Sequence, residues 1–481
     1  MSLIIENKSV AGVVWSAIER FSVQGIQFVL SIVIARLINP SDYGLIAMLG
    51  IFLAIAQTFT DSGFSQALIQ KKNRNETDFS TVFFFNFGIS VVIFLLFCLG
   101  ASGIASFYNE PKLELITRWV ALNIILTALS IVQRTELTIK MDFKTQAKAS
   151  LVSVVLSGIL GVTLAWLGFG VWALVWQTLC NSLLNTILLW ILSTWKPRLL
   201  FSWCSFKELF SFGSKLLASG LLHTIYTNMY SLVIGKKYTP AEVGFFNRAS
   251  TLSQFPSTNL VMIITRVSYP THCELQNEPE KLRKSFIQYI RLSSFFIFPL
   301  MVALAALAEP LVHVLLTDKW KEVVPLLQIL CLANMWLPVM YLNNNMLAVK
   351  GRTDFFLRAE IIKKVTGILI MLATLPLGVK ILCMGLVLYS IADMVLTIYY
   401  TRKVIDCGYM VQLKNVLPIA LTAFLMGIVM ISVTKIFNGY WIQLLAGSFS
   451  GLFTYLLLVY VFRFDETVYL KSVLNKLRKY V

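Results

Sequence analysis

Long apolar segments separated by short polar breaks run through the whole sequence. A helix rises 1.5 Å per residue, so about 20 mostly apolar residues cross the roughly 30 Å hydrocarbon core of a bilayer. This pattern predicts an all-α polytopic membrane protein with fourteen transmembrane helices. The predicted spans lie near residues 10–38, 43–69, 80–106, 113–137, 147–168, 171–193, 207–235, 241–269, 285–308, 322–348, 356–377, 380–401, 413–436 and 440–462.

The composition agrees with a membrane protein, because 57% of the 481 residues are hydrophobic and only 14% are charged. Soluble domains carry about 25% charged residues. The net charge of +17 would suggest nucleic acid in a soluble chain. Here the cations gather in the breaks between spans, so we expect no nucleic-acid partner. The breaks are also too short to hold a soluble catalytic domain.

The lysines and arginines of the breaks alternate between a rich and a poor side, with a roughly threefold excess on the rich side. Cytoplasmic loops carry this excess in membrane proteins. We therefore predict a multi-pass protein of the bacterial inner membrane with both termini in the cytoplasm. The rich side includes Lys71, Lys72 and Arg74, Lys140, Lys144 and Lys148, Lys281, Arg283 and Lys284, and the tail.

The cysteines and histidines do not form a metal-binding or disulfide pattern. The seven cysteines are scattered without a C-x-x-C pair, and the three histidines are far apart in the sequence. We expect no metal site, no catalytic site and no disulfide framework.

A fourteen-residue motif occurs twice, 200 residues apart. Ser31–Gly44 reads SIVIARLINPSDYG, and Ser231–Gly244 reads SLVIGKKYTPAEVG. In each copy a helix ends, a residue suited to an N-cap follows, and proline then stands at the first position of the next helix. Asp42 or Glu242 at the third position completes a capping box. Convergence on good capping residues is one explanation, but the identities before the turn favour a true repeat.

The repeat sets the expected domain organisation. It maps the first span onto the seventh, and an offset of six spans means that both copies cross the membrane in the same direction. A weaker similarity relates VLSGILG in the fifth span to VTGILI in the eleventh. We predict two parallel six-helix lobes plus two further helices around a central cavity. The boundaries are 1–194 and 207–404 for the lobes, 195–206 for the linker, and 405–481 for the last two helices and the basic tail.

Charged residues inside a bilayer are costly, so each is a candidate for function. Arg20 lies about 15 Å into the first span, and Gln24 and Gln27 share its helix face at i+4 and i+7. Such a polar stripe should face protein or water. The alternative is a structural ion pair of Arg20 within one lobe.

The eighth span carries a second polar stripe. Asn247, Arg248 and Gln254 lie about one third of the way into it, and Pro256 should kink the helix. The position that matches Arg248 in the first copy is Met48. Because the repeat does not need this charge, we expect Arg248 to bind a ligand.

Three acidic residues are candidates for coupling transport to an ion. Glu19 is in the first span, Asp61 in the second and Asp393 near the middle of the twelfth. Each could carry H⁺ or Na⁺, or could pair with a buried arginine. No other cofactor is expected. The intramembrane cations are mainly arginines, which stay charged and bind phosphate with two parallel hydrogen bonds.

Four sequences together resemble a known family: SIVIARLINPSDYGLIAM, GFGVWALVWQTL, YTPAEVGFFNRASTLSQFPSTNL and MLAVKGRTD. They are similar to the Wzx-type polysaccharide flippases, of the colanic-acid type, in the multidrug/oligosaccharidyl-lipid/polysaccharide superfamily. The resemblance covers essentially the whole chain.

The resemblance implies a transporter that moves undecaprenyl-pyrophosphate-linked oligosaccharide across the membrane by alternating access, for surface polysaccharide or lipopolysaccharide biosynthesis. Its partners would include membrane lipids and other polysaccharide assembly proteins. In the related lipid II flippases, the first, second, seventh and eighth spans line a cavity whose cations bind pyrophosphate. That role carries over to Arg20 and Arg248 by helix and depth.

Three other functions remain as alternatives. A multidrug exporter of the same superfamily should have mainly acidic residues in its cavity. A membrane-embedded polymerase or glycosyltransferase should have a large periplasmic loop or paired catalytic acids, and the sequence has neither. A scaffold without transport should have no polar cavity.

Overall fold

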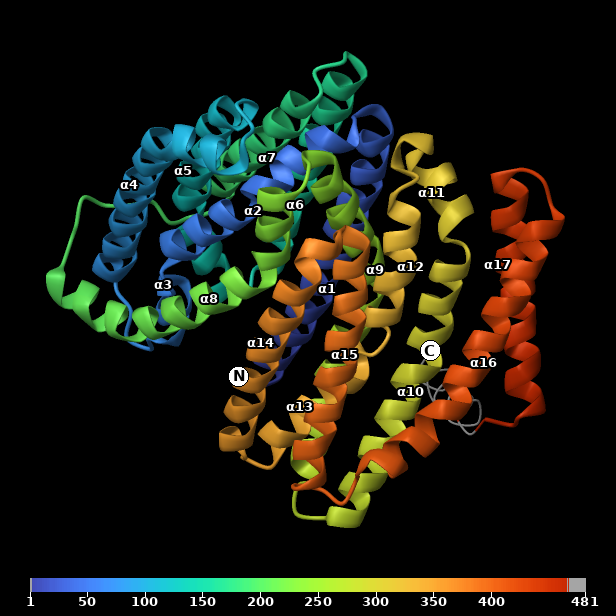
Figure 1. The fold of residues 1–481 in the computed structure, drawn as a ribbon. Coiled ribbons are helices and arrows are strands. Elements are labelled where there is room, and N and C mark those ends of the chain that lie inside the picture. The colour runs from blue at the N-terminus through green and yellow to red at the C-terminus, as the bar shows by residue number, and fades with distance from the viewer. Residues whose placement is uncertain (1, 465, 467–481) are drawn as a thin grey trace. The chain divides into compact units, whose positions relative to one another are not determined.

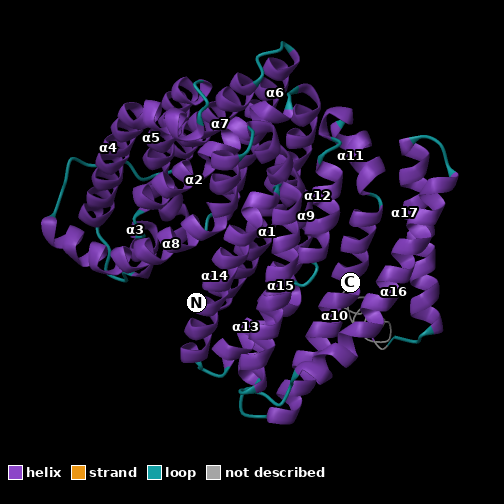
Figure 2. Cartoon of the chain, in the orientation of Figure 1, coloured by secondary structure: helices purple, strands orange, loops and turns teal. Residues whose placement is uncertain are grey.

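The regular elements in the described part of the chain are all helical (Figure 2). The computed structural model describes residues 2–464 and 466. The chain divides into two units, Met1–Gly244 and Phe245–Val481, with the boundary inside one helix. Each of the fourteen predicted spans coincides with a helix or a pair of consecutive helices (Figure 1).

The first unit contains eight helices and the start of a ninth. They are α1 Ser2–Leu37, α2 Pro40–Asp61, α3 Phe64–Gln70, α4 Glu76–Tyr108, α5 Lys112–Ile139, α6 Phe143–Trp166, α7 Val171–Leu192 and α8 Trp203–Lys237. Helix α1 packs on α6, and α5 packs on α4 and α7. Helix α8 lies along α2 and also contacts α3 and α4. The predicted seventh span is therefore packed on helices of the first six.

Apolar packing fixes the linker that precedes α8. Trp195 is buried in a cluster with Phe64, Phe83 and Leu209. Its indole Nε1 donates a hydrogen bond of 3.0 Å to Oε2 of Glu76. Trp195 of the predicted linker is thus part of the core of the first unit, whereas Arg198 and Leu199 after it are exposed.

Within its described residues, the second unit contains the rest of α9, eight further α-helices and two short 3₁₀ helices. They are α9 Pro240–Glu274, α10 Pro279–Ala306, α11 Ala308–Leu316, η1 Asp318–Trp320, α12 Val323–Asn334, α13 Leu337–Val349, α14 Thr353–Thr374, η2 Leu375–Leu377, α15 Val379–Arg402, α16 Tyr409–Ile436 and α17 Tyr440–Val461. Helix α15 packs against α12, α13 and α14, and α16 lies between α10 and α17. Asn343 and Gln412 join α13 to α16 through two amide hydrogen bonds of 3.0 and 2.9 Å.

Ten helical segments are long and apolar enough to cross a membrane within the described residues. The four predicted spans outside this set are α1, α8, α9 and α14. These helices carry polar residues inside the predicted spans; α14, for example, contains Glu360 and Lys363 near its middle. The multi-pass membrane fold is confirmed, and the count of fourteen stays a prediction for these four helices.

Two predicted spans are interrupted. The second breaks between α2 and α3, where Ser62 and Gly63 have φ values of 48° and 72°. The tenth breaks between α12 and α13, just before Pro338 at the start of α13. Pro256 was expected to kink the eighth span, and α9 continues as a helix through both Pro256 and Pro270.

The two copies of the repeated turn pack against each other in the first unit. A Cβ atom at Gly44 would overlap the carbonyl oxygen of Pro240, and one at Gly244 would overlap that of Pro40. Only glycine allows this reciprocal approach of the two backbones. In the second copy Thr239 and Glu242 form the predicted capping box. In the first copy Asn39 holds the N-cap position without a side-chain hydrogen bond.

Candidate functional site

The polar stripe of α1 is present in part among the described side chains. Gln24 is half-buried and Gln27 is exposed. Within the described part of the chain, the Oε1 atom of Gln24 is buried and accepts no hydrogen bond. A buried acceptor without a donor is costly, and a ligand with hydroxyl groups would satisfy it. The side chain of Arg20 lies outside the described residues.

Glu19 and Asp61 each accept a hydrogen bond from a serine. The hydroxyl of Ser150 on α6 donates to Oε1 of Glu19 over 3.1 Å. The hydroxyl of Ser65 donates to Oδ1 of Asp61. Asp61 is the last residue of α2, directly before the break at Ser62. Both carboxylates are half-buried.

The stripe of α9 holds a buried cation. Arg248 is 6% exposed, and its guanidinium carbon lies 5.6 Å from the ring centroid of Trp320, which is fully buried. An aromatic face stabilises a cation at this distance. Asn247 is half-buried, while Gln254 is exposed. The sequence singled out Arg248 by its depth, but it gave no sign that Trp320, 72 residues later, would pack on it.

The stripe of α1 belongs to the first unit, and the stripe of α9 from Asn247 onward belongs to the second. Their common cavity therefore remains a prediction. The structure does bring candidate residues into contact with other polar or charged side chains inside each unit. The clearest case is Asp393 in the second unit.

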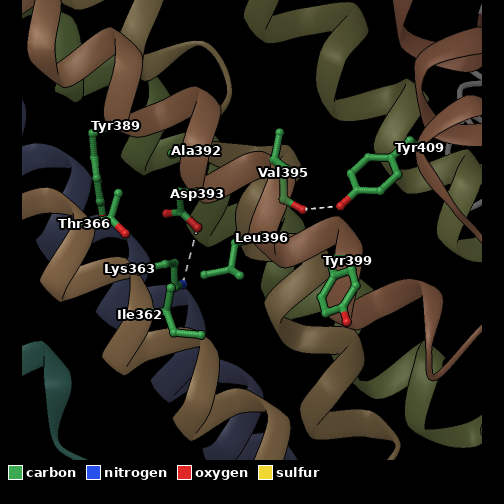
Figure 3. A pocket seen from close by; sticks show the side chains of 10 residues that line it. All are labelled: Ile362, Lys363, Thr366, Tyr389, Ala392, Asp393, Val395, Leu396, Tyr399 and Tyr409. Carbon is green, nitrogen blue, oxygen red and sulfur yellow. Dashed lines mark hydrogen bonds and ion pairs between the residues drawn. The ribbon is translucent and has the colours of Figure 1, made fainter. Parts of the chain in front are cut away.

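Asp393 lines a cavity of about 360 Å³ between α14, α15 and the start of α16 (Figure 3). Its Oδ1 atom lies 3.4 Å from Nζ of Lys363 on α14. The same ammonium lies 2.5 Å from Oε1 of Glu360, three residues earlier on its helix. Lys363 is 5% exposed. Sequence reasoning missed Glu360 and Lys363, although two charges inside a predicted span were a usable signal.

Comparison with known proteins gives a consistent result. A model of the family described as "Polysaccharide biosynthesis protein" matches residues 33–325. The lipopolysaccharide biosynthesis protein WzxC of Escherichia coli K12 is 25% identical over 75% of this chain and 73% of its own length. The teichuronic acid biosynthesis protein TuaB of Bacillus subtilis 168 is 25% identical over 73% of each chain.

The solved structures agree on the fold. A structure titled "Lipid II flippase MurJ, inward closed conformation" matches with a TM-score of 0.77, over 94% of this chain and 100% of its own, at 14% identity. An inward-facing multidrug transporter of the MATE family in the MOP superfamily matches with a TM-score of 0.62, over 82% of this chain and 97% of its own, at 15% identity. The predicted resemblance is thus confirmed, and the chain has a transporter fold rather than that of an enzyme.

Proposed function

The chain belongs to the polysaccharide biosynthesis protein family, and on that premise we propose that it flips an undecaprenyl-pyrophosphate-linked oligosaccharide across the bacterial inner membrane. The names of its relatives support a polysaccharide precursor as the substrate. The likeness to flippase and exporter structures supports transport through alternating access. The distribution of lysine and arginine supports cytoplasmic termini.

The observation that carries the proposal is the buried guanidinium of Arg248 in the polar stripe of α9. A guanidinium remains charged in a poorly solvated site and binds two phosphate oxygens at once. Its matching residue in the first copy, Met48, is also buried, so burial at this position does not require a charge. A pyrophosphate is the part of the proposed substrate that needs such a cation.

The rest of the substrate has separate partners in this proposal. Arg20, Gln24 and Gln27 on α1, with Asn247 and Gln254 on α9, would bind the pyrophosphate and the sugar hydroxyls. The lipid tail would stay in the bilayer. The cavity would open first to the cytoplasm and then to the periplasm, so that the charged headgroup never enters the hydrocarbon core unpaired.

Replacing Arg248 in the bacterium that encodes this chain tests this proposal, with surface polysaccharide as the measured quantity. Arg248→Ala should abolish surface polysaccharide while the protein remains in the membrane at the wild-type amount. Arg248→Lys should give partial activity, because lysine keeps the charge and loses the bidentate geometry. Arg118→Ala is the control, since Arg118 is an exposed residue paired with Glu114.

Full polysaccharide export by Arg248→Ala would overturn the assignment of this residue. The exporter alternative has its own readout, which is the growth of the same strains with cationic drugs. If removal of the chain lowers drug resistance and leaves surface polysaccharide unchanged, the flippase function itself is wrong.

A further inference from the structure

A second cavity lies between α10 and α16, near the ends of these helices that the distribution of lysine and arginine predicts to be cytoplasmic. The two helices pack side by side (Figure 1). The cavity has a volume of about 280 Å³, whereas one water molecule needs only about 10–15 Å³. Its polar and charged lining residues are Lys284, Gln288, Arg291, Asn415 and Glu466. None of them is among the substrate-binding residues proposed above.

Three of the lining residues come from one face of α10. Lys284, Gln288 and Arg291 are spaced i, i+4 and i+7, which places their side chains on the same side of a helix. The stretch from Lys284 to Arg291 covers about 10 Å along the helix axis. The two cations therefore stand at different depths of one cavity, with the amide of Gln288 between them.

Arg291 already binds an anion in this cavity. Its Nε and Nη2 atoms donate hydrogen bonds of 2.5 and 3.1 Å to Oε1 and Oε2 of Glu466. The carboxylate of Glu466 belongs to a residue that is only 5% exposed. Two parallel N–H groups that hold two carboxylate oxygens also fit two oxygens of a phosphate. The guanidinium of Arg291 is thus oriented as an anion-binding group.

Lys284 supplies a second cation to the wall. It is exposed, and within the described part of the chain its ammonium has no carboxylate partner. Its basic neighbours Lys281 and Arg283 are paired with Glu278 and Asp406. The charged residues that line the cavity are two cations and one carboxylate, so they sum to +1 when all are ionised. An anionic ligand would balance this charge.

The wall of the cavity continues into exposed apolar surface on α10. Ile287 and Leu292 line the cavity itself. Phe296 and Leu300 follow Leu292 at i+4 and i+8, and they are 44% and 51% exposed. They lie deeper in the predicted span 285–308 than the two cations do. A ligand with a phosphate in the cavity and a hydrocarbon chain along this strip would match both surfaces, and a free phosphate would match only the first.

We propose that this cavity binds the phosphate group of an anionic phospholipid from the cytoplasmic leaflet. Lys284 and Arg291 pair with the phosphate oxygens. The amides of Gln288 and Asn415 donate hydrogen bonds to the remaining oxygens of the headgroup. Basic pockets between membrane helices on the cytoplasmic side recognise headgroups of this kind. Lipid binding at this site does not rest on the proposed flippase function.

Glu466 competes with the lipid for Arg291 in this proposal. The phosphate and the carboxylate are both negative, and both use the N–H groups of the same guanidinium. Removing Glu466 should therefore favour the lipid, while removing Arg291 should oppose it. A purely structural ion pair makes a different prediction, because loss of either partner would then damage the site in the same direction.

Binding of phosphatidylglycerol to the purified full-length protein in detergent tests the site, with bound lipids counted by native mass spectrometry. The wild type should bind phosphatidylglycerol more tightly than phosphatidylethanolamine with the same acyl chains. Lys284→Gln and Arg291→Gln should each weaken the binding of phosphatidylglycerol about fivefold, which is the contribution of one basic residue at an anionic headgroup. Glu466→Gln should strengthen it.

Lys414→Gln is the matched control, since Lys414 is an exposed cation at the same end of α16 and does not line the cavity. Its lipid binding should equal that of the wild type. An equal loss in Lys414→Gln and Lys284→Gln would mean that a basic surface attracts the lipid diffusely, and the proposal would be wrong.

Two further outcomes would also contradict the proposal. If Glu466→Gln weakens lipid binding as much as Arg291→Gln does, the pair is structural and no competition exists. If Arg291→Gln does not fold, Lys284→Gln and Gln288→Ala decide, and wild-type binding in both would overturn the site.

Inorganic phosphate distinguishes a lipid headgroup from a free phosphate as the source of the anion. Phosphate added at a fixed lipid concentration should not displace phosphatidylglycerol, because it lacks the hydrocarbon chain. The lipid assignment is wrong if phosphate raises the melting temperature of the wild type and not of Lys284→Gln, while phosphatidylglycerol binds no better than phosphatidylethanolamine. If neither ligand depends on Lys284 or Arg291, the cavity binds no anionic ligand and the whole proposal is refuted.

Discussion

The two copies of the repeat differ most where the second copy carries charges inside its helices. Met48 on α2 is 1% exposed, and its counterpart Arg248 on α9 is 6% exposed. The sequence Gly-Ile-Leu occurs in α6 and α14, and the residue four positions before its glycine is Val154 in α6 and Lys363 in α14. Val154 is buried as well. These two positions are buried in both copies, but only the second copy has a charged residue at each of them.

This difference distinguishes residues that the fold requires from residues that we expect to serve transport. The glycines of the turn, Gly44 and Gly244, are present in both copies and pack reciprocally. These glycines are therefore required for the packing of the two turns. Arg248 and Lys363 occur in one copy only, so the helices form without them. We therefore expect changes at shared positions to lower stability, and changes at the unshared charges to lower transport.

The largest effect on stability should come from placing an arginine at position 48 of the first copy, which matches Arg248 of the second copy. Met48→Arg places a cation at a position that is 1% exposed, and an unpaired buried charge costs on the order of 3–5 kcal/mol. The amount of protein in the membrane and its thermal unfolding in detergent should both fall. Met48→Leu is the control, because a hydrophobic exchange of similar volume costs less than about 1.5 kcal/mol.

The reverse exchange, Arg248→Met, should leave thermal unfolding near that of the wild type while surface polysaccharide is lost. If Met48→Arg is as stable as the wild type, position 48 can solvate a charge. The contrast between the two copies would then not reflect function.

A smaller loss of stability is expected from Gly44→Ala. The added Cβ would overlap the carbonyl oxygen of Pro240, which is backbone and cannot move away alone. Overpacking of this kind costs about 1–3 kcal/mol. Gly244→Ala should cost a similar amount, because its Cβ would meet Pro40 in the same way. Thermal unfolding of the purified variants measures both.

Gly50→Ala is the matched control on the same helix, since nothing lies within 4 Å of its would-be Cβ. Alanine favours a helix over glycine by about 1 kcal/mol, so this variant should be at least as stable as the wild type. Equal losses at Gly44 and Gly50 would mean that helix flexibility, and not the crossing of the two turns, requires the glycines.

Much of this fold could be predicted from local sequence. Each of the fourteen segments predicted from hydropathy is helical, although only ten are long and apolar enough to cross a membrane, and the Thr239–Glu242 capping box followed from residue spacing alone. The break after α2 was missed, although Gly63 adopts a positive φ of 72° there. Hydropathy averages over about 20 residues and does not detect a two-residue change in the backbone.

The candidate site was harder to predict because its contacts are distant in sequence. Arg248 could be found from its depth in a span, but its packing on Trp320 depends on how α9 meets η1. Asp393 could be found in the same way, whereas its partner Lys363 is 30 residues earlier on another helix. Depth identifies a charge that needs a partner, and only tertiary packing identifies the partner.

The smallest expected effect concerns the ends of the two copies that lie farthest along the chain from the repeated turn. In the first copy, the helical segment that follows the repeated turn ends with α3 at Gln70, and Lys72 beyond it is exposed. In the second copy α9 continues to Glu274 and buries His272 completely, with ring centroids 6.3 Å from Phe286 and 5.3 Å from Tyr289. Burial lowers the pKa of His272 from 6.5 to about 4. The second copy should therefore lose stability in mild acid.

The direction of this change in stability with pH follows from proton binding to His272. Below pH 6.5 the unfolded chain binds a proton at His272, and the folded protein does not until the pH nears 4. Stability should thus fall as the pH drops between these values, by on the order of 1–2 kcal/mol at pH 5. His272→Phe should remove this part of the pH dependence of thermal unfolding, and His223→Phe, at an exposed position, should keep it. If His272→Phe loses as much stability between pH 7.5 and 5 as the wild type, acid acts elsewhere, and the ends of the two copies do not differ in the way that their burial indicates.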